Sequence, residues 1–313
     1  MSDRCPLTYV PLADGERFYS VAGLRALSPR LESLAPLEFT SEELRHEAAA
    51  RSDKMSVGGV QPKVSAVLKP SEGRFELVTS GGRYLLKPEN PLYPEVPANE
   101  DLTMRLAASA GVRVPPHGLL HTRDSGLCYF IQRFDRFGRN SKLAVEDFAQ
   151  LLSLDRETKY DASMEQVASV VDRFCTFPVL EKVALLRLTL VVFLTGNEDM
   201  HLKNFSLITE QDGTRRLTPA YDLLNSTIAL RKPSEELAIP LGGKKSRLHR
   251  EHFLDYFGRE RLGLNERVVM RVLDEVAAAQ PSWDALLSRS FLNDTLRDRY
   301  AALLADRRNR LGI

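Results

Sequence analysis

Hydrophobic and polar positions follow two different periods in the two parts of the chain. In the first part, short runs of β-branched and aromatic residues alternate with the turn sequences SEG and SGG, which predicts an antiparallel meander. Its strands are expected at residues 64–68, 75–79 and 84–87. Two further strands are expected on either side of a turn at residues 124–126. Before them all, Thr40 and Glu43 have the pattern of a capping box, which predicts a helix that ends near Arg51.

Helical spacing appears once between the strands and dominates after Arg136. The first such helix is expected in ANEDLTMRLAASAG and ends at Gly111, because glycine favours helix C-termini. The later helices are expected in VEDFAQLLSL, MEQVASVVDRF, VALLRLTLVVFLTG, LNERVVMRVLDEVAAA and LNDTLRDRYAALLADRR. We therefore predict an α+β protein with two lobes. A small β-rich lobe with a glycine-containing loop covers residues 1–135, and a larger helical lobe covers residues 136–313, with a ligand cleft expected between them.

Composition and charge exclude several classes of protein. Hydrophobic residues make up 43% of the 313 residues and the formal net charge is +1, which argues against a disordered chain and against a broad basic surface for nucleic acid. The longest apolar stretch, Val183–Gly196, is interrupted by Arg187 and is shorter than the roughly 20 residues of a bilayer span. No apolar segment typical of a signal peptide opens the sequence, and the basic run GGKKSRLHR is interpreted as a solvated loop.

The three cysteines, Cys5, Cys128 and Cys175, are widely spaced and odd in number. This pattern predicts neither a disulfide framework nor a thiolate zinc site. We therefore expect a reducing, cytoplasmic location with no membrane partner.

Polar side chains suited to catalysis follow directly on the most apolar stretch, in the sequence GNEDMHLKNFSL. Asp199 precedes Asn204 by five residues, and a further acid, Asp222, lies in the next segment, TPAYDLLNS. In the protein-kinase template an Asp accepts the proton of the attacking hydroxyl, and an Asn five residues later and a second Asp bind magnesium. A rigid helix that ends at Gly196 would fix the base of such a loop. The same interval occurs by chance, so ordinary polar loop residues are the alternative interpretation.

Two upstream elements favour the kinase interpretation. Lys87 ends an expected strand and Glu100 lies on the following helix, an arrangement in which an ion pair holds a phosphate-binding lysine. A surface lysine and a glutamate that interacts with the helix dipole are the alternatives. The turn SVGGVQPK lacks the Walker A sequence, yet its glycines would let backbone N–H groups approach phosphates; a hairpin entry is the alternative. The segment LLKPEN is rejected as a catalytic loop, because Leu85 stands where the base would be.

Taken together, SVGGVQPK, LLKP, ANE, RFDR, EDFAQLLSL, GNEDMHLKNFSL and TPAYDLLNS resemble the HipA family of bacterial serine/threonine kinase toxins. The resemblance runs from about Ser56 to Ser226. It implies a two-lobed, protein-kinase-like fold that uses ATP and Mg²⁺. By this resemblance Asp199 is the catalytic base, and Asn204 and Asp222 are the metal ligands beside the nucleotide.

The same resemblance assigns further residues. Lys87 would contact the nucleotide phosphates, held by Glu100. The other expected nucleotide contacts are His201, Lys203, Gly58, Gly59, Val60, Gln61, Lys63, Gln132 and Phe134, the last two through the backbone at the adenine. Ser56 matches the serine that family members autophosphorylate, which expels the glycine-containing loop and switches the kinase off.

Two departures from the family pattern affect regulation and partners. The glycine-containing loop begins much earlier than in long family members, which resembles the short HipT-type toxins whose missing N-terminal subdomain is a separate HipS-like protein. Gly58 stands where some short relatives carry a second serine. The resemblance implies a HipB-like helix-turn-helix antitoxin, indirect contact with DNA, and an aminoacyl-tRNA synthetase as substrate. A catalytically silent corepressor in an antitoxin–DNA complex and a small-molecule or lipid kinase are the alternative functions.

Overall fold

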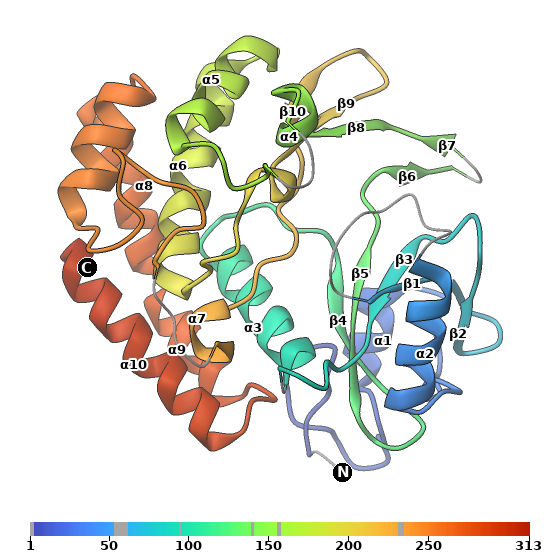
Figure 1. The fold of residues 1–313 in the computed structure, drawn as a ribbon. Coiled ribbons are helices and arrows are strands. Elements are labelled where there is room, and N and C mark those ends of the chain that lie inside the picture. The colour runs from blue at the N-terminus through green and yellow to red at the C-terminus, as the bar shows by residue number, and fades with distance from the viewer. Residues whose placement is uncertain (1–2, 53–61, 94, 139–140, 155–157, 231–234) are drawn as a thin grey trace. The chain divides into compact units, whose positions relative to one another are not determined.

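The computed structural model describes residues 3–52, 62–93, 95–138, 141–154, 158–230 and 235–313. The chain forms two compact units, which are drawn in Figure 1. The first unit comprises residues 1–102, 115–133 and 289–292, and the second comprises residues 103–114, 134–288 and 293–313. The chain first passes from one unit to the other within helix α3 (Val96–Ser109).

The first unit is built on a five-stranded antiparallel sheet in the order β2-β1-β3-β5-β4. The strands are β1 (Val64–Lys69), β2 (Arg74–Leu77), β3 (Tyr84–Lys87), β4 (His117–His121) and β5 (Leu127–Gln132). The five strands predicted from the sequence are therefore confirmed, with shifts of one or two residues at their ends. The predicted meander is wrong in its order, because β1 pairs with both β2 and β3.

A glycine explains how the chain crosses from one side of β1 to the other. The N–H of Val78 donates to the Ser65 carbonyl and the N–H of Arg83 donates to the Ala66 carbonyl, both at 2.9 Å, so the connection passes close over β1. A Cβ on Gly82 would lie 1.9 Å from Ser65 Oγ. Only glycine permits this approach, and the crossover that it permits replaces the meander.

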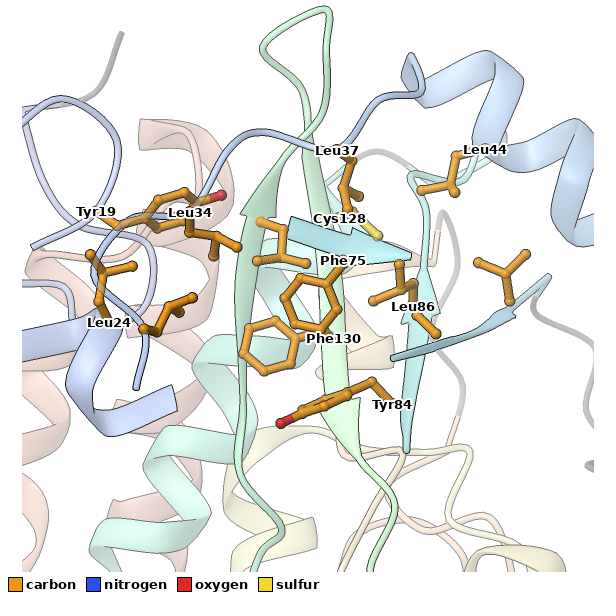
Figure 2. Close-up of a cluster of buried hydrophobic side chains, with 14 of the residues drawn as sticks. Tyr19, Leu24, Leu34, Leu37, Leu44, Phe75, Tyr84, Leu86, Cys128 and Phe130 are labelled. Atoms are coloured by element: carbon orange, nitrogen blue, oxygen red, sulfur yellow. The ribbon is translucent and has the colours of Figure 1, made fainter. Parts of the chain in front are cut away.

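Helices and the N-terminal segment cover this sheet with one apolar core (Figure 2). Helix α1 (Val21–Leu27) and helix α2 (Ser41–Ser52) belong to this segment. The predicted capping box of α2 is confirmed: the Thr40 N–H donates to Glu43 Oε2 at 2.8 Å, and the Glu43 N–H donates to Thr40 Oγ1 at 3.1 Å. The labelled core side chains come from the N-terminal segment, α2 and the strands: Tyr19, Leu24, Leu34, Leu37, Leu44, Phe75, Tyr84, Leu86, Cys128 and Phe130.

The second unit is mainly helical, as predicted. Its helices are the second half of α3, α4 (Phe148–Leu151), α5 (Met164–Phe174), α6 (Pro178–Thr195), η1 (Leu202–Asn204), α7 (Ser226–Ala229), η2 (His252–Arg261), α8 (Glu266–Ala278), α9 (Gln280–Ser288) and α10 (Asp294–Leu311). Its strands are β6 (Arg136–Phe137), β7 (Ser141–Lys142), β8 (Ala144–Asp147), β9 (Ser206–Thr209) and β10 (Arg215–Leu217). The apolar stretch forms α6, which packs against α5, α8 and α10 (Figure 1).

A small sheet in this unit corrects one expectation. The segment VEDFAQLLSL was expected to be a helix, but Ala144–Asp147 forms β8 and pairs with β9 in the three-stranded sheet β10-β9-β8. Only one helical turn, α4, follows it. All three cysteines are free and buried. Within the described ranges, no helix has both the length and the apolarity needed to cross a membrane.

Candidate active site

The buried helix α6 ends at Gly196, where the polar loop begins. Gly196 adopts the left-handed conformation, with φ of +74°, and its N–H donates to the Phe193 carbonyl at 3.2 Å. A Cβ at this position would lie 2.7 Å from Asn225 Oδ1. The loop therefore leaves α6 in a direction that a side chain at residue 196 would obstruct.

One fully buried side chain, that of Asn197, joins two of the three candidate catalytic residues. Asn197 Oδ1 accepts from the Asp199 N–H at 3.0 Å, and Asn197 Nδ2 donates to the Asp222 carbonyl at 3.4 Å. Asn204 Nδ2 donates to the Asp199 carbonyl at 3.1 Å, which leaves the Asn204 amide oxygen for another partner. The backbones of Asp199 and Asp222 are thus tied to one residue. Asp222 also has φ of +54°, a conformation that non-glycine residues adopt rarely.

A tyrosine and a histidine lie against the proposed base. Asp199 is exposed, and the Tyr160 hydroxyl donates to its Oδ1 at 2.5 Å. The Tyr160 ring meets the His201 ring edge to face, with 5.1 Å between the centroids. Burial lowers the pKa of His201, while the carboxylates of Asp199 and Asp222 act in the opposite direction. The His201 imidazole therefore interacts electrostatically with both acids, and burial makes its neutral form the favoured one.

Tyr221 connects the second acid to the loop. Its hydroxyl donates to the Lys203 carbonyl at 2.9 Å and lies 2.6 Å from Ser206 Oγ, and its ring packs 5.8 Å from the ring of Phe134. Since Tyr221 directly precedes Asp222, these bonds fix the backbone that carries the acid. Sequence reasoning assigned no role to Asn197, Tyr160 or Tyr221, although the tyrosine in TPAYDLLNS stood next to a predicted site residue.

Lys203 lies in the same loop but its side chain contacts an acid of the small sheet. Lys203 Nζ lies 2.6 Å from Asp147 Oδ2, while Asp147 Oδ1 accepts from the Gln150 N–H and caps α4. The ion pair therefore ties the loop to the start of α4. A contact between Lys203 and a nucleotide stays a prediction.

The first unit holds the predicted lysine and glutamate together. Lys87 Nζ lies 2.6 Å from Glu100 Oε1, with Lys87 4% and Glu100 0% exposed. Glu100 lies in the second turn of α3, so its partner here is a side chain rather than the helix N-terminus. Lys87 Nζ also lies 5.6 Å from the centre of the Tyr129 ring. The contact of Lys87 with phosphate stays a prediction.

The remaining candidate residues are distributed over both units. Gln132 ends β5 opposite Tyr84, and its N–H donates to the Pro116 carbonyl at 2.8 Å. Lys63 directly precedes β1. Predicted residues that lie outside the described part of the chain are Ser56, Gly58, Gly59, Val60 and Gln61.

The donor chemistry of the second unit fits magnesium. Mg²⁺ prefers oxygen ligands and usually takes one or two protein carboxylates together with phosphate oxygens and water. Asn204 and Asp222 offer an amide oxygen and a carboxylate, which satisfies that preference without further protein ligands. The described residues contain no cluster of three or more His, Cys, Asp or Glu side chains suited to a metal.

An antiparallel sheet with a buried Lys–Glu pair, and a buried helix that leads into an Asp–Asn loop beside a second Asp, define an α+β protein of the kinase-like class. Residues 55–283 match the family model of the HipA-like C-terminal domain. The chain belongs to this family.

The most similar curated proteins include kinases from several bacteria. A putative kinase of Haemophilus influenzae is 26% identical over 92% of this chain and 91% of its own length. The putative kinase Y4mE of Sinorhizobium fredii is 31% identical over 60% of this chain, and the serine/threonine-protein kinase toxin HipA of Shewanella oneidensis is 31% identical over 55%. The chain spans 46% and 43% of these last two proteins, which is less than half their length.

Two solved structures confirm the predicted fold. HipA of Shewanella oneidensis, from its complex with HipB and operator DNA, aligns with a TM-score of 0.68 at 21% identity and covers 96% of this chain and 80% of its own. The proinflammatory kinase CtkA of Helicobacter pylori aligns with a TM-score of 0.57 at 15% identity and covers 82% of this chain and 91% of its own. At these identities the likeness establishes the α+β, kinase-like fold alone.

Proposed function

We propose that this chain is an ATP-dependent serine/threonine protein kinase that acts as the toxin of a bacterial toxin–antitoxin system. The observation that carries the proposal is the bonding of Asn197, which ties the Asp199 backbone to the Asp222 backbone. Asn204 is bonded into the same group through the Asp199 carbonyl. An acid, an amide and a second acid held in this way are the residue types that a phosphoryl-transfer site uses.

Each residue has a distinct part in the proposed reaction. Asp199 accepts the proton of the attacking hydroxyl, and its exposure lets a protein side chain reach it. Asn204 and Asp222 hold Mg²⁺ through their side-chain oxygens. The bound metal supplies positive charge that stabilises the transferring phosphoryl group. Lys87, kept in place by Glu100, supplies a further positive charge to the nucleotide phosphates.

The test is transfer of label from γ-labelled ATP to protein in a bacterial lysate. We expect Asp199→Ala and Asp222→Ala to abolish the labelled protein band and growth inhibition while thermal unfolding stays close to wild type. Asp298→Ala, an exposed acid of α10, is the matched control and keeps full activity. Wild-type labelling by either site variant contradicts the assigned roles. Label in small metabolites instead of protein identifies a small-molecule kinase, and an absence of magnesium-dependent ATP binding identifies a catalytically silent corepressor.

The finer part of the proposal concerns substrate, regulation and partners. The acceptor is a serine of a translation factor, with an aminoacyl-tRNA synthetase as the first candidate, and a HipB-like helix-turn-helix protein is the antitoxin that brings the complex to DNA. The support for this partner is that the HipA structure of Shewanella oneidensis contains HipB and operator DNA. A separate HipS-like protein is a further candidate partner. Phosphoproteomes of cells that express wild type or Asp199→Ala identify the acceptor directly.

Autophosphorylation at Ser56 is proposed as the switch that turns the kinase off. Phosphate would add about −2 charge next to the nucleotide phosphates, and the repulsion would displace the segment that carries Ser56. Mass spectrometry of the active protein should find phosphate on Ser56, and Asp199→Ala protein should lack it. Persistent absence of this phosphate in active protein removes autophosphorylation from the proposal.

A further inference from the structure

Tyr160 occupies the position on Asp199 that a substrate hydroxyl needs. A general base must lie about 2.6–3.2 Å from the oxygen whose proton it takes. The Tyr160 hydroxyl donates to Asp199 Oδ1 at 2.5 Å, so one of the two carboxylate oxygens already accepts from an internal hydroxyl at the distance that a nucleophile would need. This contact lies entirely within the second unit.

Several contacts hold Tyr160 in this position. The Leu202 N–H, from the candidate catalytic loop, donates to the carbonyl of neighbouring Lys159 at 3.3 Å. On the other side, Ser163 caps α5 through the Gln166 N–H. The Tyr160 ring packs edge to face on His201, and Lys159 Nζ lies 4.8 Å from its centre. The tyrosine is therefore bound to the loop that carries the base, although it is 39 residues from Asp199 in sequence.

The Tyr160 hydroxyl remains protonated and bonded to Asp199. Burial, followed by the hydrogen bond to Asp199, raises the pKa of Tyr160 above its ordinary value of 10.0. The hydroxyl therefore stays protonated at neutral pH and continues to donate to the carboxylate. At the same time Tyr160 is 38% exposed, so a substrate hydroxyl can reach the site and displace it.

We propose that Tyr160 is a positioning residue that occupies Asp199 Oδ1 and favours a protein hydroxyl over water as the group that replaces it there. In productive transfer, the acceptor oxygen forms a bond to the γ-phosphorus, the bond to the β–γ bridging oxygen breaks, ADP leaves, and the hydroxyl proton passes to Asp199. If water takes the place of the acceptor, the same bond changes give ADP and inorganic phosphate. A bound protein substrate offsets the loss of the Tyr160 hydrogen bond with its other contacts, whereas a water molecule has none to offer.

The inference rests on the proposed kinase function and is tested with Tyr160→Phe, which removes the hydroxyl and keeps the ring against His201. Inorganic phosphate released from Mg·ATP without an acceptor protein is measured together with phosphate incorporated into the kinase itself. We expect phosphate release to rise about five-fold, which is the change in an equilibrium constant that one net hydrogen bond produces. The ratio of phosphate release to incorporation should rise as well. The matched control is Tyr256→Phe, because the Tyr256 hydroxyl also donates to a carboxylate, Glu165 Oε1 at 2.9 Å. This control should leave both rates unchanged.

The outcomes separate this inference from the proposed function. Phosphate release that is unchanged or reduced in Tyr160→Phe overturns the inference, as does an equal rise in Tyr256→Phe. A purely structural role would lower the unfolding temperature and leave the ratio of release to incorporation unchanged, which also overturns it. The double variant Tyr160→Phe with Asp199→Asn should lose the additional release. If Asp199→Asn alone retains full incorporation into protein, the proposed function fails irrespective of Tyr160.

Discussion

Replacing Gly196 by alanine tests how the end of α6 positions the candidate catalytic loop. The residue has φ of +74°, and the left-handed region costs a residue with a Cβ about 1–2 kcal/mol. The new Cβ would also lie 2.7 Å from Asn225 Oδ1 and 3.1 Å from Leu303 Cδ2. Overpacking of this kind costs about 1–3 kcal/mol, and a displaced Asn225 loses its cap on α7, worth about 1 kcal/mol.

A second glycine provides a matched control in the same unit. Gly213, in the turn between β9 and β10, has φ of +84° but no atom within 4 Å of its added Cβ. Gly213→Ala therefore carries the backbone cost without the steric one. We expect the two variants to differ by about 3 kcal/mol in free energy of unfolding, or about 6–12 °C in unfolding temperature for a unit of this size.

The assay is thermal unfolding of both variants, followed by γ-phosphate transfer at a temperature where both are folded. Gly196→Ala should also lose transfer activity, because the displacement begins directly before Asn197, whose side chain accepts from the Asp199 N–H. Adding Asn225→Ala should recover part of the stability, since it removes the clashing oxygen. Equal losses of stability in Gly196→Ala and Gly213→Ala would refute the steric argument, and an unchanged transfer rate in Gly196→Ala would show that the loop does not depend on this helix end.

Two further predictions concern buried charge. Glu100→Ala should destabilise the protein by about 3–5 kcal/mol, because it removes a buried carboxylate that lies 2.6 Å from the buried charge of Lys87. Asp255→Ala, which breaks an exposed pair with Arg259, should cost less than about 1 kcal/mol in the same urea titration. Burial lowers the pKa of His201 below its ordinary value of 6.5, so the unfolded chain binds more protons there and stability is lost as pH falls below about 6.5. His201→Gln should therefore show a smaller loss of unfolding free energy than wild type between pH 7.5 and pH 5.5. Equal losses in the two proteins would show that His201 is not the source of this pH dependence.

Local patterns were sufficient to predict the elements of the fold but not their arrangement. The α2 capping box involves residues three apart, and α6 is recognisable from a continuous apolar stretch, so both were predictable from sequence. The order of β1, β2 and β3 was not, because a meander and a crossover place the same alternating pattern on the same sheet faces. The crossover depends on Gly82 passing over Ser65, a contact between segments that sequence spacing does not reveal.

In the candidate site, too, some residues could be predicted from the sequence and others could not. Asp199 and Asn204 were identified because their interval matches a known chemistry, and Asp222 because it follows in the expected order. Residues that contact the loop from outside it were missed, because they are distant in sequence. Tyr160 lies 39 residues from its partner Asp199, and Asp147 lies 56 residues from its partner Lys203. Strand β8, which brings Asp147 to Lys203, was expected to be helical. The four residues AVED are compatible both with a strand and with the first turn of a helix that continues into α4.

The loop from residue 197 to residue 204 owes its shape mainly to residues outside it. Within the loop, Asn197 and Asn204 bond the Asp199 backbone, but the loop's position depends on Asp222, on Tyr221 and on Ser226 Oγ, which accepts from the Glu198 N–H at 2.7 Å. Three of the positions that hold the loop therefore lie in one segment, residues 221–226, which also carries the second acid. Because the same segment bonds the loop that carries Asp199 and also contains Asp222, the two candidate residues cannot be displaced independently. A site built in this way keeps its acid, amide and second acid in register even though Asp222 lies in a different segment from Asp199 and Asn204.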